Sequence, residues 1–398
     1  MKILWLKSDF LHPTTKGGQI RTLETLRRLH IRNEVHYVAY DNPAQPEGLK
    51  RSSEYCARAY PVKLESPPKG SPKFFLETAA NLLSSTPAVI SRYHSKTMEQ
   101  LVAKLVREER YDSLVCDFLT PAPNVPKLEN CVLFQHNVET MIWRRYAQHA
   151  PDPLRRAYFG LQARRMFEYE GKVCRTAGHV IAVSKADADL MRNMFGATRV
   201  SDVATGVDLE YLAPPASAPF VADLVFVGSM DWLPNMDGME DFLENILPRI
   251  RQRRPGCSLA IVGRNPPQKL KDLTAKDPKI TVTGTVPDVR PYLWGSSVSI
   301  VPLRIGGGTR LKIYESMAAK TAVVSTTIGA EGLDINPPEN IRIADTPEAF
   351  AEECVELLED ASLRQRITTA GWEMVSSRFS WEQVTREFER ILADGPRP

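Results

Sequence analysis

Three consecutive glycines follow shortly after an apolar run, VSIVPL, that ends at Leu303. A run of glycines lets the backbone approach a bulky anion closely. Thr309 comes next and can cap the following helix, whose first amide groups and dipole favour phosphate. The segment therefore predicts a site for a phosphate-bearing ligand. Its glycines are Gly306, Gly307 and Gly308.

Charged residues continue this pattern on a helix that we expect from Thr309 to Ala319. Arg310 and Lys312 supply two cations, and Glu315 lies three residues after Lys312, on the same side of a helix. A carboxylate at the ligand end of a Rossmann-like unit commonly accepts hydrogen bonds from both ribose hydroxyls, so a nucleotide is the natural ligand. The alternative is a glycine-rich turn with a surface Lys–Glu pair.

A second candidate group lies near the start of the chain, where Gly17 and Gly18 separate the apolar run KILWLKS from a helix that begins near Gln19. A glycine pair at a strand-to-helix turn permits close approach to a diphosphate or to an acceptor. Arg21 follows one turn into the helix. The alternative is a tight turn with no ligand.

The strand CVLFQ leads into a third group, His136, Asn137 and Glu139. A histidine that emerges from a buried strand can position a sugar hydroxyl near neutral pH, although such a residue is often structural. We take His136 as the catalytic candidate, with Asn137 and Glu139 in acceptor or base roles. Asp117, at the end of SLVCD, and Ser184, at the end of HVIAVS, are weaker candidates that border the same edge.

The elements that position these residues alternate between strands and helices in both halves of the chain. This alternation predicts two doubly wound parallel sheets with helices on both faces, an α/β fold. The Pro-, Ala- and Ser-rich segment 205–222 predicts a hinge between domain 1–204 and domain 223–379. The closing helix, 380–394, carries Val384, Phe388 and Ile391 on one face and is expected to pack back on the first domain.

Composition and charge exclude several classes of protein. The chain has 398 residues, a formal net charge of +3, and no apolar run of the roughly 20 residues that a membrane span needs. It also has no signal-peptide pattern and no nucleic-acid-binding signature, so we expect a cytoplasmic protein without a nucleic-acid partner. Six scattered cysteines suggest neither disulfides nor zinc.

A basic helix, expected over Leu154–Arg175, carries six Arg and Lys residues beside Tyr158, Leu161 and Phe167. Such a face can rest on anionic lipid at the inner face of the cell membrane, or it can be a solvated surface. Phe74, Phe75 and Leu76, flanked by Lys69 and Lys73, form a second candidate contact. The basic residues are Arg155, Arg156, Arg164, Arg165, Lys172 and Arg175.

The segment PLRIGGGTRLKIYESMAAKTAVVSTTIGAEGL resembles the donor site of family 4 glycosyltransferases, retaining enzymes with the two-domain GT-B fold. FVGSMDWLPN, AIVGRNP, VTGTVPDVRPYL and FSWEQV occur in the expected order, so the resemblance spans most of the chain. It is greatest to the members that build bacterial exopolysaccharide and other surface polysaccharides.

The resemblance implies a donor-binding role for several residues of the second domain. Glu315 would bind the ribose, Gly228 would begin the phosphate-facing loop, and Gly263, with Arg264 beside it, and Val286 would line the base pocket. The first-domain glycines would also approach the donor, and His136 would approach the donor sugar.

Two departures from the family pattern stand out. Gly307 occupies the position, eight residues before Glu315, where the family usually has a second glutamate. The loop that begins at Gly228 also lacks the usual Arg and Lys. We therefore expect Arg310 and Lys312 to supply the charge that a diphosphate requires.

The function expected is transfer of a sugar from a UDP- or GDP-sugar to a saccharide or lipid-linked acceptor. No D-x-D-type carboxylate pair is evident, so we expect no metal and no cofactor. Two alternatives remain: a non-catalytic nucleotide-sugar binder, which Gly307 favours, and a sugar-nucleotide epimerase of the same fold, which needs more acids.

Overall fold

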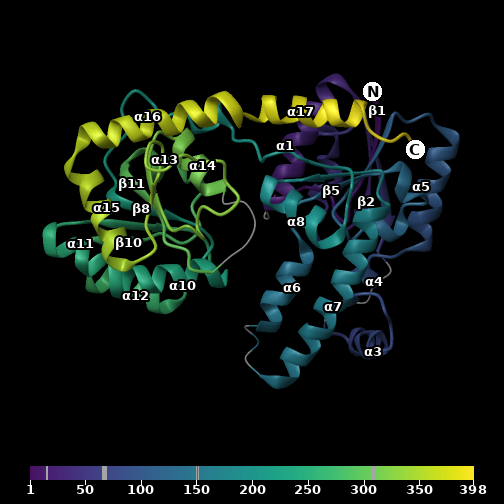
Figure 1. Cartoon of the computed structure of the whole chain (residues 1–398), viewed down its shortest axis with the longest axis horizontal. Coiled ribbons are helices and arrows are strands. Elements are labelled where there is room, and N and C mark those ends of the chain that lie inside the picture. Colours follow the sequence, from purple (N-terminus) through teal and green to yellow (C-terminus); the bar gives the residue numbers. More distant parts are fainter. Residues whose placement is uncertain (15–16, 65–69, 149, 151, 306–310) are drawn as a thin grey trace. The chain divides into compact units, whose positions relative to one another are not determined.

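The computed structural model describes residues 1–398 except 15–16, 65–69, 149, 151 and 306–310, and it does not describe the side chains of residues 73, 75 and 78. The chain folds into two compact units (Figure 1). Unit 1 comprises Met1–Thr205 and Trp381–Pro398, and unit 2 comprises Gly206–Ser380.

Unit 1 is built on a seven-stranded parallel sheet with the order β3-β2-β1-β4-β5-β6-β7. In the central strand β1, Trp5 is fully buried and pairs with Tyr37 on one side and Val115 on the other. A strand covered on both faces is apolar along its length, which explains the unbroken run in KILWL. The strands are β1 (Lys2–Leu6), β2 (Glu34–Asp41), β3 (Arg58–Lys63), β4 (Ser113–Asp117), β5 (Val132–Gln135), β6 (His179–Ala182) and β7 (Val200–Asp202).

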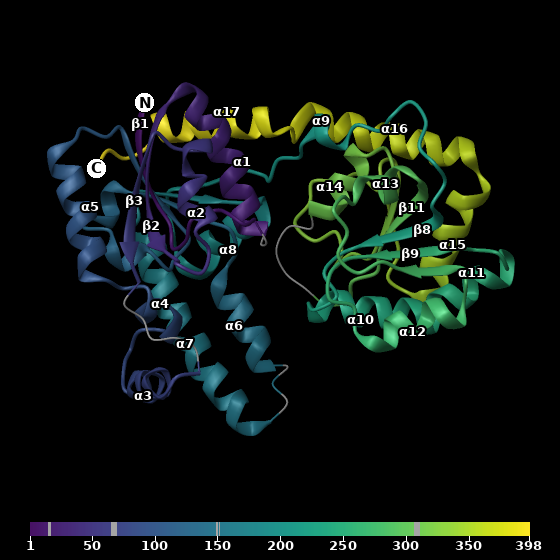
Figure 2. The ribbon, with the colours of Figure 1, turned by 180° about the vertical axis from the view of Figure 1, so that it is seen from behind.

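Two helices of unit 1, α6 and α7, form a hairpin that extends away from the sheet (Figures 1 and 2). The first turns of α7 are exposed, whereas its second half is buried against the rest of the unit. The helices are α1 (Gly17–Arg32), α2 (Glu47–Lys50), α3 (Pro72–Asn81), α4 (Ala88–Arg92), α5 (Lys96–Glu108), α6 (Glu139–Gln148), α7 (Pro153–Thr176), α8 (Lys185–Phe195) and α17 (Trp381–Ala393).

The last helix, α17, packs against α1 and completes the core of unit 1. Its apolar face buries Val384, Phe388 and Ile391. The Phe388 ring centroid lies 5.7 Å from that of Trp5 and 4.9 Å from that of Phe134. Residues from both ends of the chain therefore share one aromatic cluster.

Unit 2 is built on a six-stranded parallel sheet with the order β10-β9-β8-β11-β12-β13. The strands are β8 (Ala222–Val227), β9 (Leu259–Val262), β10 (Ile280–Val282), β11 (Ser296–Val301), β12 (Ala322–Ser325) and β13 (Arg342–Ile343). The helices are α9 (Leu209–Leu212), α10 (Leu233–Asp241), α11 (Leu247–Arg253), α12 (Gln268–Lys276), α13 (Arg290–Trp294), α14 (Leu311–Ala318), α15 (Pro347–Glu359) and α16 (Ala361–Arg378).

These two sheets confirm the fold class expected from the sequence. Two details differ. The sequence predicts one helix from Asp237 to Arg253, but a π-helical turn at Phe242–Ile246 divides it, because Pro248 cannot donate to the turn before it and its ring crowds the carbonyl four residues back. Of the segment 205–222, predicted as a hinge, Thr205 belongs to unit 1 and 206–222 to unit 2, where the backbone N–H of Val207 donates to the carbonyl of Phe379 at 2.7 Å.

Candidate functional site

A buried ion pair occupies the carboxyl edge of the sheet in unit 1, where β1 and β4 end. Lys7 Nζ lies 2.8 Å from Asp117 Oδ1, and the two side chains are 3% and 0% exposed. Trp5 Nε1 and Thr22 Oγ1 both donate to the second carboxylate oxygen, at 3.0 and 2.7 Å. Burial opposes ionisation, but the charge of Lys7 and the contact with His136 outweigh it and hold the pKa of Asp117 well below its usual range.

His136 contacts this carboxylate through its second ring nitrogen. Nε2 lies 2.9 Å from Asp117 Oδ1, and Arg21 Nη1 donates to Nδ1 at 3.1 Å. Because an arginine can only donate, Nδ1 is the acceptor and the ring proton is on Nε2. Burial lowers the pKa of His136 to about 3 against the opposing effect of Asp117, so the ring is neutral.

Both residues lie deeper than the sequence suggests. His136 was expected to emerge from the strand and Asp117 to face an acceptor, yet their exposures are 2% and 0%. The reason is Phe118, whose ring stacks on that of His136 with centroids 4.0 Å apart. Phe118 has a φ of 76°, a strained left-handed conformation for a bulky residue, and this turns its ring over the histidine.

Arg21 is also buried, at 7% exposure, and its Nε donates to Thr205 Oγ1 at 2.6 Å. Burial lowers the pKa of Arg21 to about 10, while Asp117 and Asp187 oppose this shift. At neutral pH the guanidinium remains charged. The Arg21 side chain links α1 to Thr205, the last residue of the first segment of unit 1, and fixes the tautomer of His136.

The two glycines at the start of α1 differ in their surroundings. A Cβ at Gly18 would lie 2.9 Å from the ring of Phe118, so only glycine fits there without a shift of the ring. Among the residues that the structure describes, a Cβ at Gly17 would meet nothing within 4 Å. Gly18 therefore has a packing role, and Gly17 leaves the start of the helix open. Ser184 caps α8 by accepting from the backbone N–H of Asp187 at 3.1 Å.

Asn137 and Glu139 lie half-buried at the start of α6, beside the buried carboxyl of Glu170. Burial raises the pKa of Glu139, opposed by a hydrogen bond with Asn137. Glu170 accepts from the backbone N–H groups of Glu139 and Thr140, at 2.9 and 2.8 Å, and from Gln135 Nε2 at 3.2 Å. Burial nevertheless raises its pKa to about 7. Glu170 thus holds the backbone at the start of α6, next to the candidate residues Asn137 and Glu139.

In unit 2, Lys312 reaches the loop that begins at Gly228. Lys312 Nζ donates to Asn235 Oδ1 at 3.1 Å and lies 4.3 Å from the centre of the Phe226 ring. A Cβ at Gly228 would lie 2.8 Å from Lys312 Nζ and 3.1 Å from Phe226. The expected cation therefore stands directly against the loop expected to face phosphate. Asn235 secures that loop because its Nδ2 donates to the carbonyl of Ser229 at 2.8 Å.

Gly263 adjoins the same loop from the end of β9. A Cβ there would lie 1.8 Å from the carbonyl oxygen of Gly228, so no other residue fits without a backbone shift. Arg264, next in sequence, donates through Nε to Ser229 Oγ at 2.8 Å and lies 3.7 Å from Asp231. The structure brings Gly228, Gly263, Arg264 and Lys312 together around one turn.

Glu315 lies one turn after Lys312 on α14 and is half-buried. Burial raises its pKa, and the charge of Lys312 opposes the shift. Tyr211, which is 47% exposed, senses the charge of Glu315 and stacks on the Arg290 guanidinium at 3.9 Å. An aromatic ring and a cation thus adjoin the expected ribose position.

Val286 is half-buried in the loop after β10, two residues from Gly284, which has a φ of 72°. The remaining predicted residues of this site lie outside the described residues, so their positions stay predictions. They are Gly306, Gly307, Gly308, Thr309 and Arg310.

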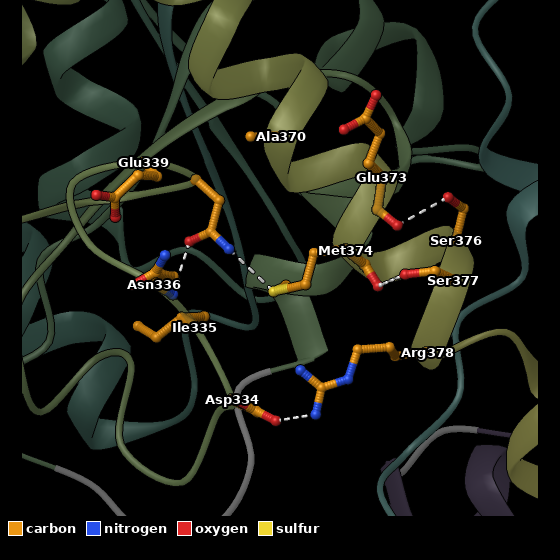
Figure 3. A pocket seen from close by; sticks show the side chains of 11 residues that line it. Asp334, Ile335, Asn336, Glu339, Ala370, Glu373, Met374, Ser376, Ser377 and Arg378 are labelled. Carbon is orange, nitrogen blue, oxygen red and sulfur yellow. Dashed lines mark hydrogen bonds and ion pairs between the residues drawn. The ribbon is translucent and has the colours of Figure 1, made fainter.

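An open hollow of about 600 Å³ lies elsewhere in unit 2, between the loop 334–340 and the end of α16 (Figure 3). Asp334 and Arg378 form an ion pair on its wall, and Glu339 and Glu373 add acidic side chains. It contains none of the predicted site residues. Its acidic lining differs from the basic turn at Gly228.

Four residues of these sites were not assigned a role from the sequence: Lys7, Glu170, Asn235 and Arg290. A signal existed for Lys7, because a charged residue directly ends the apolar run of β1. Asn235 also follows a strand that leads to a glycine loop. Glu170 and Arg290 act on residues far along the chain, and no local pattern indicates their partners.

The two parallel-sheet units, with a cation set against a glycine turn after the first strand of the second unit, define a two-domain Rossmann-like protein. Residues 222–360, about a third of the chain, match the sequence model of the family described as "Glycosyl transferases group 1". This match covers most of unit 2 and includes Gly228, Gly263, Lys312 and Glu315.

Curated relatives match over a longer segment. The lipopolysaccharide core biosynthesis glycosyltransferase LpsE of Rhizobium meliloti is 29% identical over 239 residues, which are 56% of this chain and 64% of that protein. Glycogen synthase of Mycobacterium tuberculosis is 25% identical over 250 residues, 60% of this chain and 59% of that protein. The matched segments thus span less than two thirds of these relatives.

Solved structures match over nearly the whole chain. Sucrose-phosphate synthase from Thermosynechococcus elongatus has a TM-score of 0.71 at 17% identity, and covers 99% of this chain and 98% of its own. Anabaena HepE in complex with UDP has a TM-score of 0.68 at 12% identity, and covers 99% and 100%. At these identities the likeness establishes the fold, which is the expected GT-B fold. Within the described part of the chain, no helix has the length and apolarity that crossing a membrane requires.

Proposed function

We propose that this chain is a glycosyltransferase that moves a sugar from a UDP- or GDP-sugar to a saccharide or lipid-linked acceptor. The donor binds to unit 2, and the acceptor binds to unit 1. In the reaction, the bond between the anomeric carbon and the diphosphate breaks, the acceptor oxygen forms the new bond, and its proton is released. The reaction retains the anomeric configuration, as in the family 4 enzymes that the sequence resembles.

The observation that carries this proposal is the position of Lys312 against the turn at Gly228. A diphosphate bears about two negative charges and becomes a leaving group in sugar transfer, so a fixed cation beside it favours departure. Glu315, one turn later, suits a ribose because its carboxylate can accept from two hydroxyls. Cation and acid lie one turn apart on the same helix, α14.

The comparisons support the donor class. The match to the group 1 glycosyltransferase family covers this site, and the HepE structure was solved with UDP and, in another crystal, with UDP-glucose. The LpsE relative is named for lipopolysaccharide core biosynthesis, which agrees with a saccharide or lipid-linked acceptor.

We further propose catalysis without a bound metal or cofactor, since Lys312 and Arg310 supply the charge that a metal would otherwise supply. His136, Asn137 and Glu139 are the catalytic candidates of unit 1. In the described conformation the His136 ring contacts Arg21 and Asp117, and the Phe118 ring covers it. A direct contact between His136 and the sugar therefore requires the Phe118 ring to move.

Melting-temperature shifts across UDP-, GDP- and ADP-sugars identify the donor, and hydrolysis of that donor by the purified protein separates an enzyme from a binder. We expect one nucleotide to raise the melting temperature and its sugar to be released slowly. No shift with any of the three would contradict the proposal. Inhibition by a chelator that added magnesium reverses would contradict metal independence.

A further inference from the structure

The hairpin of α6 and α7 carries an excess of positive charge that sugar transfer does not explain. Residues 139–176 contain eight Arg and Lys residues but four Asp and Glu residues, whereas the whole chain has a net charge of only +3. Two of the basic residues bond within the unit: Arg165 donates to the carbonyls of Asn81 and Leu82, and Arg175 donates to the carbonyl of Phe195. Arg144, Arg155, Arg156 and Arg164 are exposed.

A cavity of about 400 Å³ lies between the two helices of the hairpin. Arg144 lines it from α6 and Arg164 from α7, while Ala147, Gly160 and Ala163 provide small apolar walls. The Arg144 guanidinium lies 5.3 Å from the centre of the Phe167 ring, which also lines the cavity. Arg164 Nε lies 3.7 Å from Glu168 Oε1, a weak ion pair. The cavity thus combines two guanidinium groups with an apolar interior.

Strongly exposed leucines lie on the same part of unit 1. Leu154, at the start of α7, is 81% exposed, and Leu76 and Leu83, on and just after α3, are 71% and 95% exposed. The end of α3 is fixed to α7 by the hydrogen bonds of Arg165, and the two helices lie side by side in both views (Figures 1 and 2). Exposed leucines beside arginines are typical of surfaces that enter the interface of a lipid bilayer.

We propose that the α6–α7 hairpin binds an anionic membrane surface and that Arg144 and Arg164 bind the phosphate of a lipid head group in the cavity between the helices. Guanidinium groups bind phosphate oxygens through paired hydrogen bonds, and the small side chains leave room for the lipid chain that follows the phosphate. The leucines add apolar contact with the bilayer, and the remaining arginines add attraction to its charge.

The leucines favour a membrane over a nucleic acid. A nucleic acid would engage the arginines alone and would leave Leu76, Leu83 and Leu154 in water. A bilayer uses both kinds of side chain at once. Membrane binding is a separate property from the proposed sugar transfer. Vesicle flotation measures binding alone, so either proposal can fail without the other.

The test is flotation of the purified full chain with vesicles of phosphatidylcholine alone or mixed with phosphatidylglycerol. We expect the wild type to float only with the anionic vesicles, and high salt to release it. Arg144→Gln/Arg164→Gln should lower the partition coefficient roughly tenfold or more. Arg107→Gln/Arg110→Gln, two exposed arginines at the end of α5, is the matched control and should bind like the wild type.

Glu168→Gln gives a test in the opposite direction, because it removes the carboxylate near Arg164 and should strengthen binding to anionic vesicles. A misfolded chain, whose apolar surface is exposed, would also float with phosphatidylcholine alone, so the gain must be confined to the anionic vesicles. Leu154→Ser/Leu83→Ser should weaken binding at constant charge. Three results would overturn the proposal: equal flotation with both vesicle types, equal loss in the two arginine double variants, or full release by inorganic phosphate at the lipid phosphate concentration.

Discussion

Lys7 and Asp117 bring opposite charges into the core of unit 1, where the sheet excludes water. The desolvation cost of such a pair is offset only while both partners and their hydrogen bonds are present. Asp117 also holds Trp5, Thr22 and His136 in place. The pair therefore fixes the edge of the sheet at which the candidate residues of unit 1 gather.

Replacing Lys7 with Met should leave the buried carboxylate without its cation. We expect the free energy of unfolding to fall by about 3 kcal/mol or more. The double variant Lys7→Met/Asp117→Asn, in which neither charge remains, should lose clearly less than the sum of the two single variants. Urea unfolding of the four proteins measures this coupling. Strict additivity would mean that the two charges do not stabilise one another.

Lys312 is the residue on which donor binding depends in our proposal. Lys312→Ala should weaken the binding of the preferred nucleoside diphosphate by about tenfold or more, since a charged hydrogen bond to phosphate is lost. Isothermal titration calorimetry measures the dissociation constant. Lys271→Ala, an exposed lysine of α12, is the control and should bind like the wild type. Equal affinities for the two variants would contradict the role given to Lys312.

At the residue scale, spacing along one helix could be predicted from the sequence, and it places Lys312 and Glu315 one turn apart on α14. Lys312 was expected beside the phosphate loop, and the structure places it against Gly228. The burial of His136 could not be predicted, because it depends on Phe118 adopting a left-handed conformation and covering the ring. That effect arises from a neighbouring strand and has no signal in the sequence around His136.

At the scale of elements, the start of α6 depends on a single buried carboxyl group. Glu170, on α7, accepts from the first backbone N–H groups of α6, which have no partners within their own helix. Burial raises its pKa to about 7 in the folded protein, above the value near 4.5 of an exposed glutamate. Between these two values the folded state keeps a proton that the unfolded state has lost.

These two pKa values set the direction in which stability changes with pH. As pH rises from about 4.5 to 7, Glu170 should lower the stability of the wild type by up to about 3 kcal/mol, with no further change above pH 7. His136 has a pKa lowered to about 3, so it favours stability at rising pH and masks this effect. Glu170→Gln isolates it, because only the wild type titrates at this position.

The stability of Glu170→Gln minus that of the wild type should therefore increase between pH 4.5 and 7 and stay constant above it. Urea unfolding of both proteins at a series of pH values measures the difference. A constant difference over the whole range would show that Glu170 ionises at its ordinary pKa. Its hydrogen bonds from Gln135, from the backbone of Glu139 and from the backbone and hydroxyl of Thr140 would then outweigh burial.

The elements that the sequence revealed are those with strong local patterns, such as β1, α7 and α17. β3 was missed because it is a partly exposed edge strand that contains Pro61, which is unfavourable in a strand interior. α6 was missed because its start is fixed by Glu170, 30 residues or more along the chain. Elements that depend on distant partners carry weak patterns of their own.

At the scale of the whole molecule, the chain returns to unit 1 after completing unit 2. The helix α17 packs Phe388 against both Trp5 and Phe134, so the core of unit 1 is complete only when residues from both ends of the chain are present. Unit 2 has its own aromatic contact, in which the ring centroids of Phe242 and Phe350 lie 6.0 Å apart. The two buried phenylalanines, Phe388 and Phe350, are therefore matched probes of the two cores.

Phe388→Ala should remove about 3–5 kcal/mol of stability from unit 1 by leaving a cavity beside β1 and β5. Hydrogen exchange followed by mass spectrometry should then show lost protection in β1, β4 and β5, while β8, β9 and β11 keep theirs. Phe350→Ala, equally buried in unit 2, should give the reverse pattern. If both variants lowered protection equally in the two sheets, the chain would unfold as one cooperative block. Loss confined to one sheet in each variant would instead show that α17 belongs energetically to unit 1, although 175 residues of unit 2 separate it from the rest of that unit.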